Sequence, residues 1–465
     1  MSAKKVNSKE KVNSKREVNS KREVNSKKKV KSKKKAKRPT ELLPIIHPIC
    51  CGIDVHKKKM VASIILTDKS GAARFVTKTF GAFTKELFRL RDWLNEYNCK
   101  LVALESTGVY WRPLHNILEL SMKVLLVNAR HVKNVPGRKT DVSDSKWLSL
   151  LLCKGLLRGS FIPDKLTRQL RELVILRNKY TQSLGDYKRR VQKVLDTANI
   201  KIDIVASDLF GVTGRNLIHL LCSKSNGITQ ADVLDCARGT LRKKVSELYD
   251  SIHGFFEDHH RFELDNLMKT LSDLESTISK ISTRIDSLTA KDEELLLRLS
   301  DIPGIGKVGS QTVLSFLGIT LDDFQTFEHL SSWAGVCPGQ NESAGKRKSG
   351  RSRVYKHSFK TFLVVFAWGA IKKKGSFYRA KYYSLKARIG SKKAIVAIAH
   401  KMLKAIFHVI KNDATYQELG EDYHLEQHKA SKLKHINKLA DKLGYKLVLI
   451  NDDTNNNLTA PTLVA

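Results

Sequence analysis

The sequence is short of acidic residues and of long apolar runs. Its 46 Asp and Glu face 84 Lys and Arg, which gives a formal net charge of +38 and a pI near 9.9. Such a charge favours a polyanionic partner, either a nucleic acid or an anionic membrane. No apolar run approaches the ~18 residues that cross a bilayer, and the amino terminus has no apolar signal-peptide core. We therefore expect nucleic acid, not a membrane, as the partner.

The cysteines also lack a pattern that would pair them. The seven cysteines are scattered, odd in number and without a CxxC pair. This argues against a disulfide framework or a zinc site and indicates reduced thiols in a cytoplasmic protein. The 465 residues allow about three domains of ordinary size.

Residues 1–38 form a basic arm of low complexity. A six-residue repeat, beginning VNSK or VKSK, runs from Val6 to Lys35, and the arm carries 17 Lys and Arg against 3 Glu. It has too few apolar residues to fold alone, so we expect it to be disordered. It would add salt-sensitive affinity for phosphate backbones, or it is a solvated tail without a role.

Residues 48–163 predict an α/β domain with the order βββαβαβα. The β-rich runs ICCGIDVH, MVASIILTD and ARFVTKTF are typical of an antiparallel meander, and a helix, the strand LVALEST, a helix over 109–121 and the strand KVLLVNA follow. Asp54 falls on the first strand and Glu105 at the end of the fourth. Sequential strands usually lie side by side, so the first and fourth can meet at the centre of the sheet.

The stretch GRKTDVSDSKW, residues 137–147, adds an acidic pair. Asp141 and Asp144 stand three residues apart where an apolar helical pattern starts, so both can lie on one helix face. Arg138 and Lys139 just before them suggest a polyanion nearby. The alternative is that Asp141 is only an N-cap, with Asp144 in the first turn of the helix.

Together with Asp54 and Glu105, this pair predicts four carboxylates at one edge of the sheet. Carboxylate oxygens are the ligands that Mg²⁺ prefers, and two such ions can hold the attacking and leaving oxygens of a phosphodiester. The ribonuclease-H-like fold uses this constellation.

Residues 165–296 predict a helical coiled-coil region. A first helix with Leu170, Leu173, Leu176 and Tyr180 could pair with a later heptad seam inside the chain, or the seam could join two protomers. Residues 201–245 are expected to be irregular. The seam alternates spacings of three and four residues through Leu264, Leu267, Leu271, Leu274, Ile278, Ile281, Ile285 and Leu288.

Residues 297–411 predict a helical carboxy-terminal domain. IPGIG at 302–306 indicates a helix-hairpin-helix turn that could hold a phosphate, although it also fits a simple Pro-Gly turn. Residues 341–353, NESAGKRKSGRSR, predict a flexible basic loop. From 412 to 465 we expect a helix, the short strand KLVLI and a disordered tail.

Several of these segments resemble the IS110/IS1111 family of transposases. The resemblance to the family's amino-terminal DEDD domain rests on GIDVHKK, ALESTGVYW and GRKTDVSDSKWLSLLLCKGLLRGSFIP. The resemblance to its carboxy-terminal part rests on DIPGIGKVGSQTVLS, FEHLSSWAGVCPGQNESAGKRKSG and KKAIVAIAHKMLKAIFHV.

This resemblance implies a DNA transposase, a site-specific recombinase of a mobile element, in a prokaryotic, nucleoid-associated setting. It implies α/β plus all-α architecture: a ribonuclease-H-like, RuvC-like domain, the coiled-coil arm and the helical carboxy-terminal domain. It also implies Mg²⁺ as cofactor, donor and target DNA, a structured noncoding RNA encoded by the element, and a homo-oligomer, dimer or tetramer. The metal-site acids it implies are Asp54, Glu105, Asp141 and Asp144.

In the family a serine of the glycine-rich segment is the DNA-attacking nucleophile, and Ser343 matches it. Ser349 and Ser352 are close, so the choice among the three stays open. Basic residues on either side of these sites would contact nucleic acid: Arg138, Lys139, Lys346, Arg347, Lys348 and Arg351.

Two other functions fit the same residues. A RuvC-like, structure-selective endonuclease would cut with metal-activated water and form no covalent intermediate. A noncatalytic nucleic-acid-binding protein would use the charge and the helix-hairpin-helix turn alone, although four positioned acids argue against it.

Overall fold

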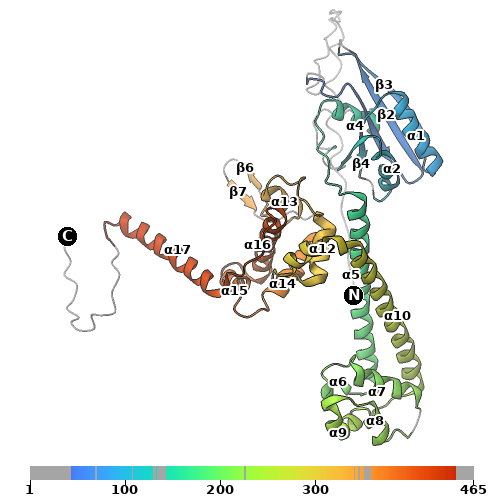
Figure 1. Cartoon of the computed structure of the whole chain (residues 1–465), viewed down its shortest axis with the longest axis vertical. Helices are drawn as coiled ribbons and strands as arrows, with labels where there is room; N and C mark the ends of the chain where they lie inside the picture. The colour runs from blue at the N-terminus through green and yellow to red at the C-terminus, as the bar shows by residue number, and fades with distance from the viewer. Residues whose placement is uncertain are drawn as a thin grey trace, which may run out of the picture. The chain divides into compact units, whose positions relative to one another are not determined.

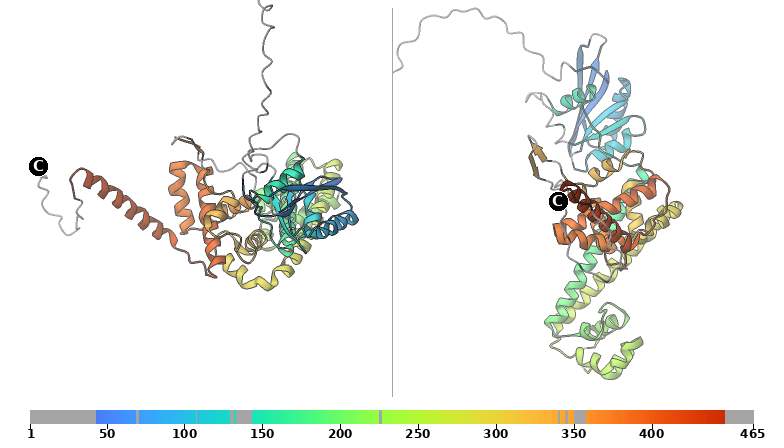
Figure 2. Two further views of the ribbon diagram at one scale, coloured as in Figure 1. Left: turned by 90° about the horizontal axis from the view of Figure 1, so that it is seen from above. Right: turned by 90° about the vertical axis from the view of Figure 1, so that its left-hand side faces the viewer.

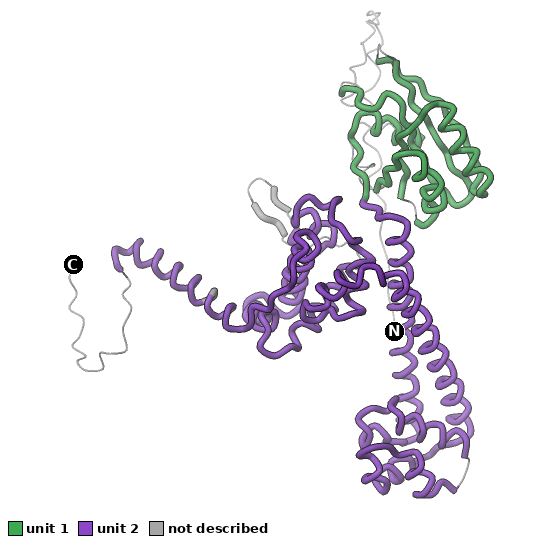
Figure 3. The backbone as a smooth tube through the Cα atoms, in the orientation of Figure 1, with its two compact units in different colours: residues 1–160 green, residues 161–465 purple. Residues whose placement is uncertain are grey.

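The protein is described by a computed structural model that forms two compact units, residues 1–160 and 161–465 (Figure 3). The structure describes residues 43–68, 71–106, 108–128, 132, 143–224, 227–339, 341–343, 346–349 and 358–446. For residues 341–343, 346–349, 424, 427 and 428 it describes the backbone alone. The basic arm and the strand KLVLI with its tail lie outside these residues. The first unit is α/β and the second is helical apart from one hairpin, which confirms the expected α/β plus all-α class.

A mixed sheet of five strands in the order β3-β2-β1-β4-β5 forms the centre of the first unit (Figure 1). β1 pairs antiparallel with β2, and β2 with β3, whereas β4 runs parallel to both β1 and β5. The predicted meander and the central meeting of the first and fourth strands are thereby confirmed. The strands are β1 (Ile49–Val55), β2 (Lys59–Thr67), β3 (Ala73–Gly81), β4 (Leu101–Glu105) and β5 (Lys123–Val127).

Helices cover both faces of this sheet. α4 (Asp144–Cys153) lies on one face, and α1 (Thr84–Glu96) and α2 (Trp111–Leu118) lie on the other (Figures 1 and 2). α1 is amphipathic, and its Trp93 packs 5.5 Å from the ring of Phe80 on β3. The core under α4 includes Cys50, Ala103, Val127, Trp147, Leu148, Leu151 and Leu152.

Two long antiparallel helices, α5 (Lys165–Thr197) and α10 (Asp258–Thr289), run through the second unit. Ile285, near the end of α10, packs with Leu170 and Val174 near the start of α5. Leu264, near the start of α10, packs with Val191 and Leu195 near the end of α5. The predicted heptad seam is therefore used within the chain.

The predicted apolar face of α5 is partly wrong. Leu170 is buried as expected, but Leu176 is 40% exposed, and Val174 and Arg177 are buried in its place. The helix repeats every 3.6 residues, so the face that contains Leu170 continues through Val174 and Arg177.

The expectation that residues 201–245 are irregular is wrong. Short helices there share a buried core with the ends of α5 and α10, including Leu217, Leu221 and Val233. Helices of this length show little apolar periodicity and are stabilised by packing, which is why the sequence pattern did not reveal them. They are α6 (Ile202–Val205), α7 (Val212–Ser223), α8 (Gln230–Cys236), η2 (Gly239–Lys244) and α9 (Val245–Ser251).

The carboxy-terminal helices share a second large core in which α16 is a central element, with Ile398, Met402 and Ile406 all buried. The segments of this part of the chain, of which η3 and α17 add no residue to the core, are η3 (Ala290–Asp292), α11 (Glu293–Ser300), α12 (Gly306–Leu317), α13 (Phe327–Trp333), α14 (Ser358–Ala370), α15 (Phe377–Ile389), α16 (Ser391–Lys411) and α17 (Gly420–Lys442).

The predicted turn at residues 302–306 joins α11 to α12. Gly304 has φ +85°, and a Cβ atom there would lie 2.3 Å from the carbonyl oxygen of Phe366 and 2.4 Å from the amide nitrogen of Ala370. Only glycine fits this conformation and this contact. The turn is thus packed against α14, while Gly306 and Lys307, where α12 begins, are exposed.

A polar network joins α5, α10 and α12 at this point. Arg177 Nη1 donates to Gln311 Oε1 at 3.0 Å, and Gln311 Nε2 donates to Asp286 Oδ1 at 2.6 Å. Lys307 Nζ lies 3.1 Å from the same carboxylate oxygen. Burial lowers the pKa of Arg177, and the negative charge of Asp286 opposes this. Burial raises the pKa of Asp286, but hydrogen bonds from Gln311 and Lys307 outweigh it and leave that pKa below its ordinary value.

Candidate metal and nucleic-acid site

Asp54 and Glu105 lie at the same end of two central strands. β1 and β4 are parallel, with Gly52 opposite Ala103 and Ile53 opposite Leu104. Asp54 and Glu105 are the next residues on each strand. The carboxyl ends of parallel strands are where ligands commonly bind in α/β proteins. The sequence-predicted pair is therefore placed on neighbouring strands, at a suitable edge.

Helix α4 packs directly on β1 because Gly52 has no side chain. A Cβ atom at Gly52 would lie 2.4 Å from both the carbonyl oxygen of Ser145 and the amide nitrogen of Ser149. Ser63, opposite Gly52 on β2, shares a buried hydrogen bond of 2.8 Å between its Oγ and that of Ser145. These contacts fix the depth and the position of α4 on the sheet.

The direction of α4 places its first residue near the acids. Ser145 contacts Gly52, whereas the carbonyl oxygen of Cys153 accepts hydrogen bonds from the amides of Ile46 and His47, just before β1. α4 therefore runs antiparallel to β1 and begins at the end where Asp54 lies. Side chains alternate along a strand, so Asp54 shares with Gly52 the face that α4 covers.

Asp144 is the first residue of α4 and precedes Ser145. The structure thus gathers Asp54, Glu105 and Asp144 at one edge and on one face of the sheet. The amino-terminal end of a helix also favours negative charge, which stabilises carboxylates there. Asp54 Oδ2 lies 3.0 Å from His56 Nε2, and the Asp54 side chain is 16% exposed.

The remaining predicted residues of this edge are not described. Asp141, Arg138 and Lys139 lie outside the described residues. Whether Asp141 completes the set of four acids therefore stays a prediction.

Ser343 lies on a two-stranded hairpin, not in the flexible loop that we expected. β6 (Asn341–Ser343) pairs antiparallel with β7 (Lys346–Ser349), with Ser343 opposite Lys346. A run of lysine and arginine shows no strand alternation, so the sequence did not predict this pairing.

The hairpin separates two of the three candidate serines. Ser343 ends β6 next to the turn, whereas Ser349 is opposite Asn341 at the other end of the hairpin. Lys346, Arg347 and Lys348 follow one another on β7. Arg351 and Ser352 lie outside the described residues.

Two family models match the chain. Residues 51–200 match a model described as a transposase, the DEDD domain of the IS110 type. Residues 297–383 match a model described as the transposase IS116/IS110/IS902 family. The chain belongs to the IS110 family of transposases. No curated protein matches it.

Membership in this transposase family indicates an enzyme that processes DNA. Within the described part of the chain, no helix is long and apolar enough to cross a bilayer. The first model covers the sheet from Cys51 onward, α4 and the whole of α5, and the second covers the turn at 302–306 and the β6–β7 hairpin. The acids and Ser343 therefore belong to the two matched parts of the transposase.

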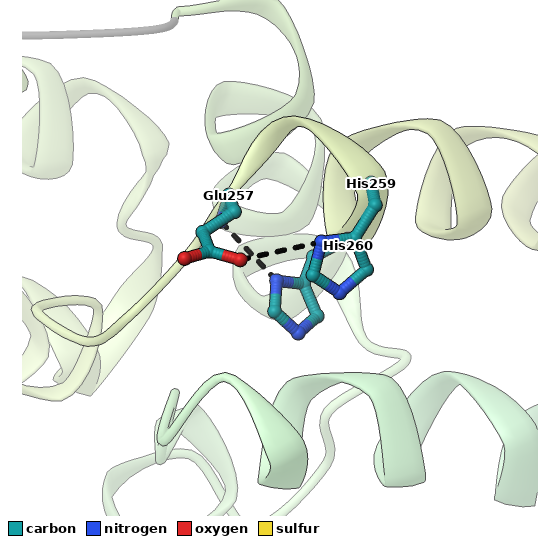
Figure 4. A group of neighbouring side chains, drawn as sticks. All are labelled: Glu257, His259 and His260. Carbon is teal, nitrogen blue, oxygen red and sulfur yellow. Dashed lines mark hydrogen bonds and ion pairs between the residues drawn. The ribbon is translucent and has the colours of Figure 1, made fainter.

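The transposase contains one further group that could hold a metal ion, which the sequence analysis missed. Among the described residues, Glu257, His259 and His260 have ligand atoms that all lie within 4.8 Å of one another (Figure 4). A group this close is not formed by Asp54, Glu105 and Asp144, which are also among the described residues and lie at one edge of the sheet. The sequence signal that could have revealed this group is a pair of adjacent histidines that follows a glutamate by two and three residues, at the start of the helix with the heptad pattern.

The same three residues already cap helix α10. The Glu257 side chain accepts from the His260 backbone amide, and the Glu257 amide donates to His260 Nδ1 at 3.2 Å. His259 Nδ1 lies 3.4 Å from Glu257 Oε2 (Figure 4). These bonds satisfy amides that a helix start leaves unpaired. An ion bound through His260 Nδ1 would have to replace a capping bond, so the group is first of all a helix cap.

Proposed function

We propose that this transposase is a site-specific DNA recombinase that cuts and rejoins DNA through a serine nucleophile, with Mg²⁺ held by Asp54, Glu105, Asp141 and Asp144. The observation that carries the proposal is the meeting of β1 and β4 under the start of α4. It brings three of the four acids to one edge, although 90 residues separate Asp54 from Asp144 in the sequence.

The residues at this edge suit Mg²⁺. They offer hard carboxylate oxygens, and Asp54 is partly exposed and so within reach of an ion and of a phosphate. When bound, the ion would stabilise negative charge on the phosphate and on the leaving oxygen. The carboxylates would hold it, beside the start of α4.

Ser343 would act as the nucleophile. Its Oγ would lose its proton and form a bond to a DNA phosphorus while the bond to one deoxyribose oxygen breaks, and that oxygen would take up a proton and leave as a hydroxyl. The resulting phosphoserine ester conserves the bond energy for the rejoining step. The position of Ser343 opposite Lys346, with Arg347 and Lys348 adjacent on β7, supports this role because cations there would offset the charge that develops on the phosphate. Nucleic-acid contacts by Arg138, Lys139 and Arg351 belong to the same proposal.

The acids and the hairpin belong to different units, so the reaction requires that they meet on the DNA. We propose that this occurs in a homo-oligomer, a dimer or a tetramer, which would restrain cutting by a lone protein. A structured noncoding RNA of the element would pair with donor and target DNA and select the sequence, while the protein reads backbone and shape. The net charge of +38 supports a partner with many phosphates.

A Ser343→Ala variant tests the nucleophile. We expect loss of covalent protein–DNA adducts and of strand exchange, with DNA and RNA binding retained, because only the attacking oxygen is removed. Ser349→Ala and Ser352→Ala are matched controls that should keep both activities. Adducts that persist in Ser343→Ala and vanish in either control would assign the nucleophile to that control serine.

A structure-selective endonuclease of the RuvC-like kind is the second candidate. It is favoured by the observation that the acidic edge is built entirely within the first unit and does not need the hairpin. That enzyme would cut DNA in an Mg²⁺-dependent way with no adduct in any serine variant. A chain that cuts no DNA with or without Mg²⁺ would instead be a noncatalytic binding protein.

A further inference from the structure

Helix α17 (Gly420–Lys442) has an apolar face that nothing in the described chain covers. Its start is anchored to α15: the amide of Phe377 donates at 3.0 Å to Oε1 of Glu418, just before α17, and the ring of Tyr423 in the first turn lies 6.2 Å from that of Phe377. Beyond Tyr423, none of the described side chains up to Lys446 is buried. Figure 1 shows this helix in red, extending away from α15.

Large apolar side chains are exposed along this helix at helical spacing. Leu425, Leu433, Ile436 and Leu443 fall within one face, which Leu439 borders, and Lys429 and Lys432 lie on the same face. The leucines and Ile436 are between 45% and 72% exposed. A solitary helix of this length is marginal in water, and most helices are stabilised by packing an apolar face. A row of exposed leucine and isoleucine therefore indicates a protein partner.

The charges of α17 are divided between its two ends. Residues 421–426 hold three acids, Glu421, Asp422 and Glu426, and no lysine or arginine. Residues 429–442 hold five lysines and one acid, Asp441, and Lys446 follows the helix. The helix thus has a negative first part and a positive remainder, which makes it complementary to a reversed copy of itself.

We infer that α17 pairs with α17 of a second copy of this chain, antiparallel, through this apolar face. In that arrangement, with the helices crossing between Leu433 and Ile436, Glu426 of each helix lies beside the end of the other helix, next to Lys442. A parallel pair would set the five lysines of one helix beside those of the other at the roughly 8–10 Å that separates packed helices, about one Debye length in physiological salt. The charges consequently favour the antiparallel orientation.

Nucleic acid is a less suitable occupant of this face. Phosphates could neutralise the lysines, but they cannot cover Leu433 and Ile436, which lie on the apolar face in the middle of the helix. The pairing also leaves lysines on the outer side, for example Lys438, free to meet DNA or RNA. It rests on α17 alone and not on the proposed chemistry.

The first test measures self-association of the full chain, freed of nucleic acid, by sedimentation at several concentrations. We expect the double variant Leu433→Glu/Ile436→Glu to raise the dissociation constant at least about tenfold, a loss of about 1.4 kcal/mol. Both positions are exposed in one copy and glutamate suits a helix, so circular dichroism should show an unchanged fold. Ser431→Glu, on the opposite face of α17, adds one negative charge where the double variant adds two, and should leave association unchanged.

Three results would overturn the inference. They are a monomer at every concentration, equal association in the double variant and the control, and weaker RNA or DNA binding in the double variant without a change in mass. The last result would assign the face to nucleic acid. A monomer at every concentration would also contradict the proposed homo-oligomer. Equal association in the double variant and the control would reject only α17 as its interface and leave the proposed recombinase intact.

The second test fixes the orientation by disulfide trapping. If two helices cross between Leu433 and Ile436, residue 426 of one copy lies near residue 443 of the other. A mixture of Glu426→Cys and Leu443→Cys chains should then form a cross-linked dimer under mild oxidation, above the background of the parent chain with its own cysteines. Efficient cross-linking of Leu443→Cys alone would show a parallel pair and reject the antiparallel arrangement.

Discussion

Gly52 of β1 and Ser145 of α4 are in direct contact, since a Cβ atom on Gly52 would lie 2.4 Å from the Ser145 carbonyl oxygen. This contact joins the strand that carries Asp54 to the helix that begins with Asp144. The hydrogen bond from Ser145 to Ser63 holds the same helix laterally. The position of the acidic edge therefore depends on a residue that has no side chain.

Gly52→Ala should destabilise the first unit. The added methyl group meets backbone atoms of α4, which cannot rotate away, and overpacking of this kind costs about 1–3 kcal/mol. We expect a lower unfolding temperature and weaker Mg²⁺-dependent activity, measured by calorimetry and DNA cleavage. The matched control is Gly185→Ala in α5, where the new Cβ atom would meet only Arg189 Nη1 at 3.6 Å. This control should keep or gain stability because alanine is a better helix former.

The four acids can be tested one at a time as Asp54→Asn, Glu105→Gln, Asp141→Asn and Asp144→Asn. Each change removes a charged ligand and keeps the shape, so Mg²⁺-dependent recombination should fall about 10²-fold or more with little change in unfolding temperature. Asp92→Asn, an exposed acid on α1, is the control for charge alone. Full activity in two of the four variants would contradict the assignment of the site.

The basic arm should act through released counterions. Deleting residues 1–38 removes 17 Lys and Arg and should lower nucleic-acid affinity and flatten its dependence on salt concentration. An arm of equal length with its lysines and arginines changed to glutamine separates charge from length and should behave like the deletion. An unchanged salt slope, or a changed recombination site, would show that the arm acts otherwise.

The network of Arg177, Gln311 and Asp286 should make stability depend on pH. Its hydrogen bonds hold the pKa of Asp286 below its ordinary value, so Asp286 stabilises the fold above about pH 4, the ordinary value for Asp, and this contribution is lost as the pH falls through the folded pKa. We expect Asp286→Asn to unfold at a lower temperature than the parent chain at pH 7. The difference should shrink towards pH 3, and a constant difference would show that the charge of Asp286 is not responsible.

The cap of α10 should contribute to stability without any metal. Glu257→Ala removes an acceptor for the His260 amide and should cost about 1 kcal/mol, measured by chemical denaturation. Glu257→Asn, which keeps a capping side chain, should recover most of this loss. If a chelator lowers the stability of the parent chain to that of Glu257→Ala, the group holds a metal ion as well as capping the helix.

The sequence determined the order of the strands and helices in the first unit, because alternation along ARFVTKTF and the apolar face of α1 reflect local geometry. It also located Asp54, Glu105 and the heptad seam of α10 on the correct elements. What it could not determine was which elements touch. No periodicity in the sequence predicts which distant residues touch or where the chain turns back on itself. Three examples are the contact of Gly52 with Ser145, the packing of Gly304 on α14 and the pairing of Ser343 with Lys346.

The same reason explains the errors. The helices between 202 and 251 are too short to show a period, and they are stabilised only by packing on the ends of α5 and α10. Leu176 looked like a seam residue because leucine is apolar, but the face of α5 follows Val174 and Arg177. Sequence patterns thus decided what each segment is, and the tertiary structure decided which side chains meet, because close packing depends on shape across distant parts of the chain.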